Sequence, residues 1–459
     1  MKIVRHYFGK ILNRLQTKII HLLVSVLNYK WGSPPRWAPK EQIATIKYSE
    51  ILGNTSSIDI ESMYKGWEYS ERIWNEGRYF DSISIKKNIL ENLYASQEIG
   101  GERQIAPFMS VGWGAAIGHI GSLGAFVLGQ KLNIVPPNLR HLPVRDENSA
   151  FWIKNLFQND VGIVSSRFGF SILENPSQWH VSERLAMVRT DTNFISLYEL
   201  HESVYKDSRV ASKEIGLIID RDYENFAKLE LQNLGLPDGA WFVGLHIREK
   251  SNQLDPRVAN VETFYESISE IVGRGGWVIR FGADSMRPLP FMENVIDLNT
   301  NSEKSRRLHL FILAKSKFLL TTNSGPSVVA WALGTPVLQT NTLSIGRNLL
   351  SSSNGSIYLP KKFVTNTGDY CSFAQILASQ EAYSETDLRE KHSQGFQLAD
   401  NSEIEIFDAT KDMFNFLDTG KHLDNLSEKV NDIRKAHNAV GYGLIAPSFL
   451  RENERWFLS

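Results

Sequence analysis

Short apolar runs alternate with helical patterns between residues 105 and 341, and this alternation constrains the fold more than any other feature. Strands that alternate with helices are typical of parallel sheets, because a parallel connection needs a crossover. The alternation occurs in two sets, separated by a turn at residues 236–239, and the first set includes strands expected at 105–111 and 132–135. The sequence therefore predicts an α/β fold with two Rossmann-like domains that face a cleft.

The length of the chain, 459 residues, corresponds to two or three domains at roughly 100–200 residues each. Turn-forming residues and changes of periodicity divide it further. The predicted regions are a basic amphipathic helix at 1–30, a linker and helical, tetratricopeptide-like neck at 31–100, Rossmann-like domains at 101–238 and 239–365, and a C-terminal helical region at 366–459. We expect the last region to cross back over both halves.

Charge and cysteine content exclude several classes of function. The chain has 50 Lys and Arg against 51 Asp and Glu, so its formal net charge of −1 argues against a protein that binds nucleic acid through bulk charge. Cys371 is the only cysteine in the sequence, which rules out an intramolecular disulfide and a zinc site with several thiolates. A reducing compartment, and hence a cytoplasmic location, is the simplest interpretation.

The first 40 residues are basic and free of acid: they contain eight Lys and Arg, and the first acidic residue is Glu41. Apolar residues from Val4 to Val26 recur at spacings of three or four, which predicts one stripe of an amphipathic helix. The longest apolar run, residues 19–27, is too short to span a bilayer. We expect this helix to lie on an anionic membrane surface, at the inner face of the cytoplasmic membrane. The alternative is a helix that packs on the protein's own body with solvated charges.

The first predicted strand of the second set ends in residues suited to an anion. His246 and Arg248 end this strand and lead into a polar loop that reaches Arg257 and Asn260. A guanidinium offers a planar pair of donors that matches a phosphate. The alternative is that neighbouring carboxylates satisfy the histidine and the arginine.

A later strand of the same set ends in Asn323-Ser324-Gly325, directly before a predicted helix with Pro326 in its first turn. The free N–H groups and the positive dipole end of a helix attract anions. This turn is therefore a second candidate anion site, and an ordinary capped turn is the alternative.

A glycine-rich loop is predicted at residues 112–121, with Gly118 and His119 inside it. It lacks the GxGxxG spacing and the acidic residue of a dinucleotide site, so a nicotinamide cofactor is not predicted. In one interpretation a ligand approaches the backbone here, and His119 acts on an acceptor. In the other, the glycines allow a helix to pack closely on the sheet.

No metal site is predicted from the sequence. Asp220-Arg221-Asp222 has the DxD pattern, but it opens a predicted helix instead of ending a strand. The sequence contains no HExxH, P-loop or GxSxG motif. We therefore expect neither a metal nor a cofactor.

Four segments occur in fixed order within residues 241–341: WFVGLHIREK, GRGGWVIRFGADSMRPLP, VIDLN and LLTTNSGPSVVAWALGTPVLQTN. They resemble a family of bacterial glycosyltransferases found among the genes for O-antigen and other surface polysaccharides. The segments AIGHIGSL and LADNSEIEIFDATKDMF extend the resemblance to about residues 105–415. The strand with His-x-Arg and the later Ser-Gly turn are also similar to GDP-fucose-using fucosyltransferases of the GT-B fold.

This resemblance implies a GT-B-like fold, with residues 101–238 as the acceptor domain and residues 239–365 as the donor-nucleotide domain. The implied reaction is metal-independent transfer from a nucleotide sugar to a lipid-linked cell-surface glycan of the O-antigen, lipopolysaccharide or capsule type. Arg248 matches the arginine that binds the donor diphosphate, with His246 as its partner. The other implied contacts are Asn323, Ser324 and Gly325 at the phosphates, Asp284 or Asp297 at the base or ribose, and Gly118, His119, Arg257 and Asn260 at the acceptor.

An inverting transfer also needs a base for the acceptor hydroxyl, and His119, His246 and Glu249 are the candidates. Two other classes of function remain open at this point. One is a non-catalytic glycan- or nucleotide-binding module, which turnover of a donor sugar would exclude. The other is a helical interaction scaffold that uses residues 1–98, which would capture a partner with those residues alone.

Overall fold

The computed structural model describes residues 117–135, 140–144, 161–165, 194–211, 214–249, 255–283, 286–298, 303–343, 354–364, 368–378, 397–420, 425–437 and 443–459, with scattered positions between these ranges and back to residue 69. The helix predicted at 1–30, the linker after it, most of the neck, the strand predicted at 105–111 and Asp284 lie outside the described residues. None of the helices within these ranges combines the length and hydropathy needed to cross a bilayer.

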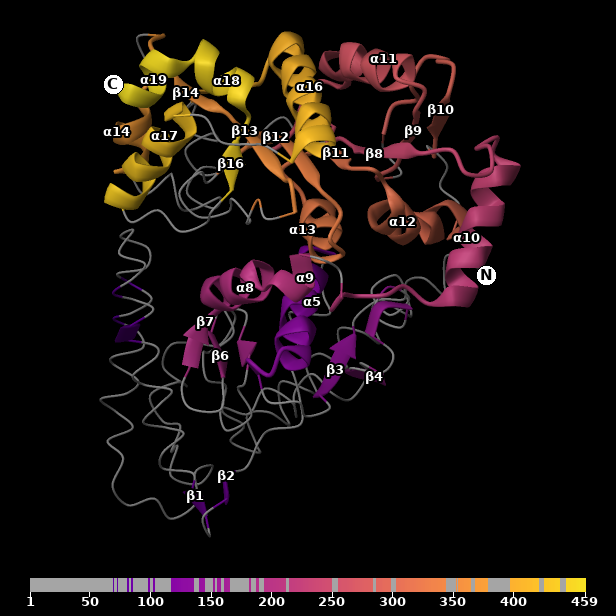
Figure 1. The fold of residues 1–459 in the computed structure, drawn as a ribbon, viewed down its shortest axis with the longest axis vertical. Helices are drawn as coiled ribbons and strands as arrows, with labels where there is room; N and C mark the ends of the chain where they lie inside the picture. The colour runs from indigo at the N-terminus through magenta and orange to yellow at the C-terminus, as the bar shows by residue number, and fades with distance from the viewer. Residues whose placement is uncertain are drawn as a thin grey trace, which may run out of the picture.

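A seven-stranded parallel sheet is the main feature of the described chain (Figure 1). Its strands, in spatial order, are β10 (Val295–Asp297), β9 (Trp277–Arg280), β8 (Phe242–His246), β11 (Leu319–Thr322), β12 (Val337–Thr342), β13 (Ile357–Pro360) and β16 (Leu444–Ile445). All neighbours are parallel, and Leu319 of β11 lies opposite both Gly244 of β8 and Val337 of β12. The sheet confirms the prediction of an α/β fold.

The strand order contains one reversal, between β8 and β11. The chain runs outward from β8 through β9 to β10, and then returns to the other side of β8 and continues through β11, β12 and β13. Ligands of such open sheets bind outside the carboxyl ends of the strands at the reversal. The topology therefore predicts a ligand site beside the carboxyl ends of β8 and β11.

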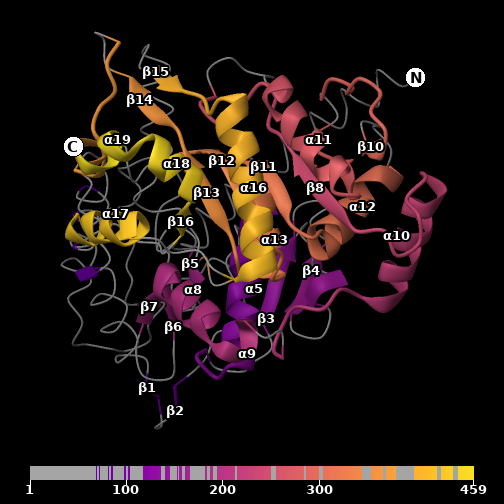
Figure 2. The same cartoon turned by 45° about the horizontal axis from the view of Figure 1, so that its top comes forward.

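Helices cover both faces of this sheet, so its strands are buried on both sides, as is usual for parallel sheets. The covering elements are α10 (Arg221–Asn233), η4 (Val261–Phe264), α11 (Tyr265–Gly273), α12 (Glu303–Lys315), α13 (Gly325–Ala332) and α16 (Glu403–Thr419). Phe242 and Leu319 belong to an apolar core with α10, α12 and α13. Their neighbours Val243 and Leu320 belong to a second core with α11 and α16, and α16 lies along that face (Figure 2).

The segment after residue 365 is largely helical, as predicted, but it also completes the sheet. β16 is the edge strand of the seven-stranded sheet, beside β13, whereas β15 (Gln397–Ala399) pairs with β14 (Lys362–Val364) in a separate two-stranded sheet. The helices α14 (Phe373–Leu377), α17 (Asn425–Ala436), α18 (Pro447–Glu452) and α19 (Glu454–Leu458) pack together near that edge. The main contacts of α16 are with α11, α18, η4 and the sheet. That the C-terminal region crosses both halves of the chain stays a prediction.

The first half is described only in parts. They are β1 (Glu98–Ile99), β2 (Glu102–Arg103), α5 (Ile117–Lys131), β3 (Arg140–Val144), β4 (Val161–Ser165), β5 (Val181–Ser182), β6 (Met187–Arg189), β7 (Phe194–Ser196), α8 (Leu197–Lys206) and α9 (Ser208–Ala211). β3 and β4 are parallel, whereas β5, β6 and β7 form an antiparallel sheet. A second Rossmann-like domain that faces a cleft therefore stays a prediction.

The strand predicted at residues 132–135 is wrong. α5 continues to Lys131, and the chain then turns at Asn133, which has a φ of 58°. The N–H groups of Ile134 and Val135 both donate to the carbonyl of Gly129, at 2.8 and 3.1 Å. Asn tolerates this left-handed conformation, and the apolar residues after it close the helix end instead of forming a strand.

Candidate functional site

The carboxyl end of β8 is held beside the end of β11. Gly244 lets β8 pack closely on α12, because a Cβ there would lie 2.8 Å from Ser316 Oγ and 2.9 Å from Ile312. Beyond the strand, the backbone N–H of Arg248 donates to Thr322 Oγ1 at 2.9 Å. The Arg248 backbone is thereby held at the sheet edge, and its side chain is 36% exposed.

His246 connects this strand end to the start of α13. Its Nδ1 lies 3.0 Å from Ser324 Oγ and 3.4 Å from Thr321 Oγ1. Ser324 is the N-cap residue of α13, yet its side chain makes no capping hydrogen bond. The structure thus brings His246, Arg248, Ser324 and Gly325 together at the strand reversal, as the sequence predicts, while their binding roles stay predictions.

The environment of His246 favours a positioning role over a general base. Burial, followed by the positive charges of His309 and Arg248, lowers the pKa of His246 to about 3. Such a weakly basic imidazole is neutral near pH 7 and takes up a proton poorly. We therefore expect His246 to orient Ser324 and to hold the first turn of α13 against β8.

The loop at residues 255–260 returns to the end of β8. Asp255 accepts two hydrogen bonds from the Arg257 guanidinium, at 2.9 and 2.7 Å, and a third from the Arg257 backbone N–H. The Arg248 Nη1 lies 3.7 Å from Asp255 Oδ2. Burial raises the pKa of Asp255, but the Arg257 hydrogen bonds and charge outweigh it, and the pKa falls to about 2. Asp255 is therefore a permanent carboxylate between two arginines.

Two predicted acceptor residues have structural partners in this loop. The Arg257 guanidinium is bound by Asp255, and Asn260 is the N-cap of η4, where its Oδ1 accepts from the backbone N–H of Glu262. Asn323, predicted near the phosphates, accepts from the backbone N–H of Leu343 at 3.1 Å, and its phosphate contact stays a prediction. These contacts place all three residues at the carboxyl edge of the sheet and explain why each is polar.

A buried ion network lies beneath the same edge. Arg280, at the end of β9, is fully buried and contacts the carboxylates of Glu249 and Asp297. The backbone N–H groups of Arg287 and Leu289 donate to the same two carboxylates, at 3.0 and 2.8 Å. Arg280 therefore engages two predicted site residues: Glu249, a candidate general base, and Asp297, a candidate contact to the nucleobase or ribose of the donor. The sequence signal for Arg280 is a single charge inside the apolar run WVIRF.

The loop predicted at residues 112–121 is a helix from Ile117 onward, so Gly118 and His119 lie in the first turn of α5. The side chain of His119 lies outside the described residues. A Cβ would lie 2.5 Å from Val328 of α13 at Gly121 and 2.8 Å from Leu217 at Gly124. These two glycines allow close packing against α13 and its neighbours, which supports the second interpretation of the glycine pattern.

The DxD pattern has a structural role as well. Asp220 caps α10, and its Oδ1 accepts from the backbone N–H groups of Asp222 and Tyr223, both at 3.0 Å. Among the described residues, no group of three or more His, Cys, Asp or Glu side chains is arranged to hold a metal ion.

Stability is expected to fall as the pH drops from 6.5 towards 4. Burial lowers the pKa of His201 and His309 to about 4, from an ordinary value of 6.5. Below pH 6.5 these histidines bind protons in the unfolded chain but not in the folded chain. The free energy of unfolding therefore decreases as the pH decreases. Melting curves across this range check the effect. His201→Phe should flatten the dependence, because the ring that stacks on Trp331 is kept without its titrating nitrogen; an unaltered slope would contradict this account.

The described fold is an α/β structure with a parallel sheet, and Arg248 and the N-terminus of α13 lie at its strand reversal as a candidate anion site. No protein-family model matches the chain, and no curated protein matches it.

Solved structures give only distant similarity. One is a glycosyl transferase of family 9 from Veillonella parvula, at 12% identity and a TM-score of 0.34, covering 63% of this chain and 95% of that chain. Another is the dodecameric, iron-containing glycosyltransferase TibC from enterotoxigenic E. coli, at 14% identity and a TM-score of 0.34, covering 69% and 77%. The complex of heptosyltransferase TibC with ADP-D-beta-D-heptose aligns at 12% identity and a TM-score of 0.36, covering 69% and 79%. Similarity at this level assigns neither an activity nor a substrate to this chain.

Proposed function

We propose that this chain is a GT-B-like glycosyltransferase that takes a sugar from a nucleotide-sugar donor. The observation that carries the proposal is the pairing of Arg248 with the first turn of α13 at the strand reversal. They lie at neighbouring strand ends: the Arg248 N–H donates to Thr322 Oγ1 at the end of β11 at 2.9 Å, and His246 Nδ1, at the end of β8, lies 3.0 Å from Oγ of Ser324, the N-cap of α13. The reaction class comes from the sequence resemblance, and the geometry supplies the partners that its charged leaving group needs.

The departing nucleoside diphosphate gains negative charge as the bond to the sugar breaks. Donors that are already oriented toward this charge stabilise the transition state more than the ground state. The guanidinium of Arg248 offers two parallel N–H groups to a phosphate, and the start of α13 offers the backbone N–H of Gly325 and the positive end of its dipole. In this proposal Arg248 is the main charge partner, and Ser324 and Gly325 line the phosphate site.

The proposed acceptor is a lipid-linked cell-surface glycan that enters from the first half of the chain, near Gly118 and His119. The resemblance supports this acceptor class, and the position of α5 against α13 puts these residues on the helix that packs beside the donor site. His119 is the remaining candidate for the base, because Glu249 is held by Arg280 and His246 is a weak base.

Ligand-dependent stability tests the donor site. Nucleoside diphosphates should raise the melting temperature, whereas nucleosides without phosphate should do so less, because the proposed site binds the phosphates. At 100 times its dissociation constant a ligand adds about 2.7 kcal/mol to the free energy of unfolding, which a thermal-shift panel detects readily. Equal responses to nucleosides and diphosphates, or no response to either, would contradict the donor site.

Activity is expected to survive a chelator. In this proposal an arginine and a helix N-terminus, rather than a divalent cation, meet the charge of the leaving group. Donor turnover should therefore be the same with and without EDTA. Loss of turnover in EDTA with recovery in manganese would show that Arg248 is not the main charge partner.

We also propose that residues 1–30 attach the enzyme to the cytoplasmic face of the membrane, a prediction that lies outside the described residues. Leu15→Glu with Leu22→Glu should release the protein from anionic vesicles, because it interrupts the apolar stripe. Activity on a soluble acceptor should be kept. If this variant unfolds, the stripe belongs to the protein core and the membrane proposal is wrong.

A further inference from the structure

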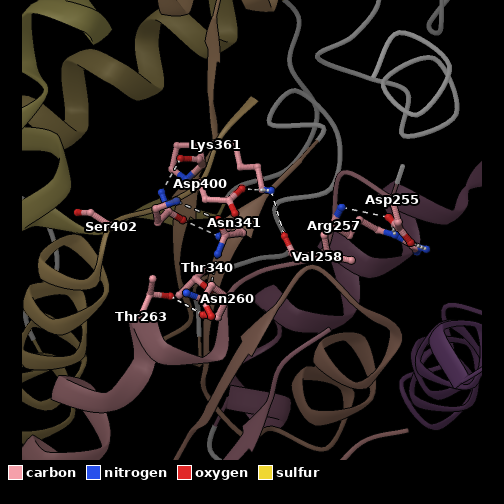
Figure 3. Close-up of polar contacts among 12 residues, drawn as sticks. Asp255, Arg257, Val258, Asn260, Thr263, Thr340, Asn341, Lys361, Asp400 and Ser402 are labelled. Atoms are coloured by element: carbon pink, nitrogen blue, oxygen red, sulfur yellow. Dashed lines mark hydrogen bonds and ion pairs between the residues drawn. The ribbon is translucent and has the colours of Figure 1, made fainter. Parts of the chain in front are cut away.

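Lys361 is a buried lysine at the carboxyl edge of the sheet that the proposed chemistry does not use. It follows β13 directly, and its side chain is only 3% exposed. Its Nζ donates to Asp400 at 2.5 Å and to the backbone carbonyl of Val258 at 3.3 Å, as Figure 3 shows. The residue therefore joins the end of β13 to the loop at residues 255–260.

The backbone around Lys361 is held by hydrogen bonds to two buried asparagine side chains. The N–H of Asn341 donates to Asn401 Oδ1 at 2.6 Å, and the N–H of Asn401 donates to Asn341 Oδ1 at 2.9 Å. Asn401 Nδ2 also donates to the carbonyl of Pro360, and the N–H of Lys361 donates to the carbonyl of Thr342. These bonds join the ends of β12 and β13 to the start of α16, so the backbone that carries the Lys361 side chain is fixed in position.

Val258, which accepts the hydrogen bond from Lys361, belongs to a loop that contacts Arg248. The N–H of Ala259, next to Val258, donates to the carbonyl of Arg248 at 3.0 Å. In the same loop, Asp255 places its carboxylate 3.7 Å from the Arg248 guanidinium. A displacement of Val258 would therefore change both the backbone and the electrostatic partner of Arg248.

We propose that Lys361 is a positioning residue for Arg248, acting through the carbonyl of Val258 and the loop at residues 255–260, with Asp400 as its counter-ion. This inference rests on the proposed function for its kinetic consequence, but its structural consequence does not. A lysine is suited to this place because its ammonium can donate to a carboxylate and a carbonyl at once.

The charge of Lys361 is balanced at this position. Burial lowers the pKa of Lys361, while the Asp400 charge and hydrogen bond oppose that shift, with a smaller contribution from Asp255. Asp400 itself is about half exposed, at 49%, so one end of the ion pair stays hydrated. The arrangement keeps a cation close to the loop without leaving two charges fully buried.

Lys361→Met tests the proposal, with Lys362→Met as its matched control. The control removes the same charge one residue further on. There, Lys362 Nζ donates to Glu405 Oε1 at 3.0 Å, and not to the loop at residues 255–260. Hydrogen exchange of the Ala259 amide, measured without substrate, should be at least about 10-fold faster in Lys361→Met and unchanged in Lys362→Met, because only the first variant frees the loop. Equal exchange in both variants would overturn the proposal.

Kinetics supply the second readout. Lys361→Met should lower kcat by roughly 10- to 100-fold with a smaller change in donor KM, because misplacement of a catalytic group of this size costs about that much. In the Arg248→Lys background the same change should have little further effect, since its action depends on Arg248. An additive effect in the double variant would overturn the positioning role.

The two proposals can fail separately. Faster exchange at Ala259 in a chain that turns over no donor would keep the coupling of Lys361 to the loop and reject the proposed function. Turnover by the unmodified chain together with unaltered exchange and kcat in Lys361→Met would reject the positioning role alone. If Lys361→Met does not fold, Asp400→Asn is the second variant, because it keeps the shape of the side chain and removes the counter-ion. It should increase the exchange rate of the Ala259 amide by a smaller factor. An unchanged exchange rate would then overturn the proposal.

Discussion

Arg248→Lys is expected to lower kcat by roughly 10²- to 10³-fold while the melting temperature stays close to that of the unmodified protein. Lysine keeps the charge but offers a compact ammonium in place of two parallel N–H groups. Because the contact strengthens as the leaving group gains charge, kcat should fall more than KM rises. Steady-state kinetics and a melting curve on the same preparation measure both effects.

Arg307→Lys is the matched control for this change. Arg307 is also a partly exposed arginine beside a carboxylate, that of Glu303, but it belongs to α12 and not to the end of β8 or β11. We expect no kinetic effect from it. If Arg248→Lys instead lowers the melting temperature and leaves kcat near its normal value, Arg248 only pairs with Asp255 and its diphosphate role is wrong.

Arg280→Met is expected to lower the free energy of unfolding by about 3–5 kcal/mol, the largest stability effect that the structure indicates. The guanidinium is fully buried between the carboxylates of Glu249 and Asp297, so its removal takes the buried cation from both and leaves Glu249 only the exposed Arg287, at 3.7 Å. Burial lowers the pKa of Arg280, and the Asp297 charge opposes that shift. Urea unfolding measures the difference.

Two further variants separate the ion network from a general packing effect. Arg274→Met removes an exposed arginine paired with Glu270 and should cost no more than about 1 kcal/mol. Replacement of Glu249 by Gln and Asp297 by Asn in the Arg280→Met background should restore part of the lost stability, because the uncompensated charges are gone. If it restores nothing, or if Arg274→Met costs as much as Arg280→Met, the network does not hold this edge together.

The strands of the sheet follow from local pattern, but their neighbours do not. The apolar runs at residues 241–248, 277–281, 295–298, 318–322 and 336–340 predict β8, β9, β10, β11 and β12 to within one or two residues of their observed bounds, because each run is short and bounded by turn residues. The pattern identifies a strand without identifying the strand beside it, so the order with β8 next to β11 comes only from the structure. The strand expected at 132–135 failed because a short apolar run after a helix fits a helix end equally well.

The candidate site was predictable where it depends on strand ends. Arg248 and Ser324 each follow an apolar run, and the carboxyl ends of parallel strands share one edge of a sheet. The partners of these residues were not predictable, since the contacts of Arg280 with Glu249 and of Lys361 with Val258 join positions far apart in the chain. Only the burial of a single charge, such as Arg280 within WVIRF, signals that such a partner must exist.

The fate of the donor tests most directly whether this chain is a glycosyltransferase. The chain is incubated with a panel of nucleotide sugars and a lipid-linked glycan acceptor, and free nucleoside diphosphate is measured beside glycosylated acceptor. We expect one donor to give diphosphate and glycosylated acceptor in equal amounts, with release reduced by roughly 10²- to 10³-fold in Arg248→Lys. Tight binding of a nucleoside diphosphate without release from any of the sugars would contradict it, and would identify the chain as a binding module.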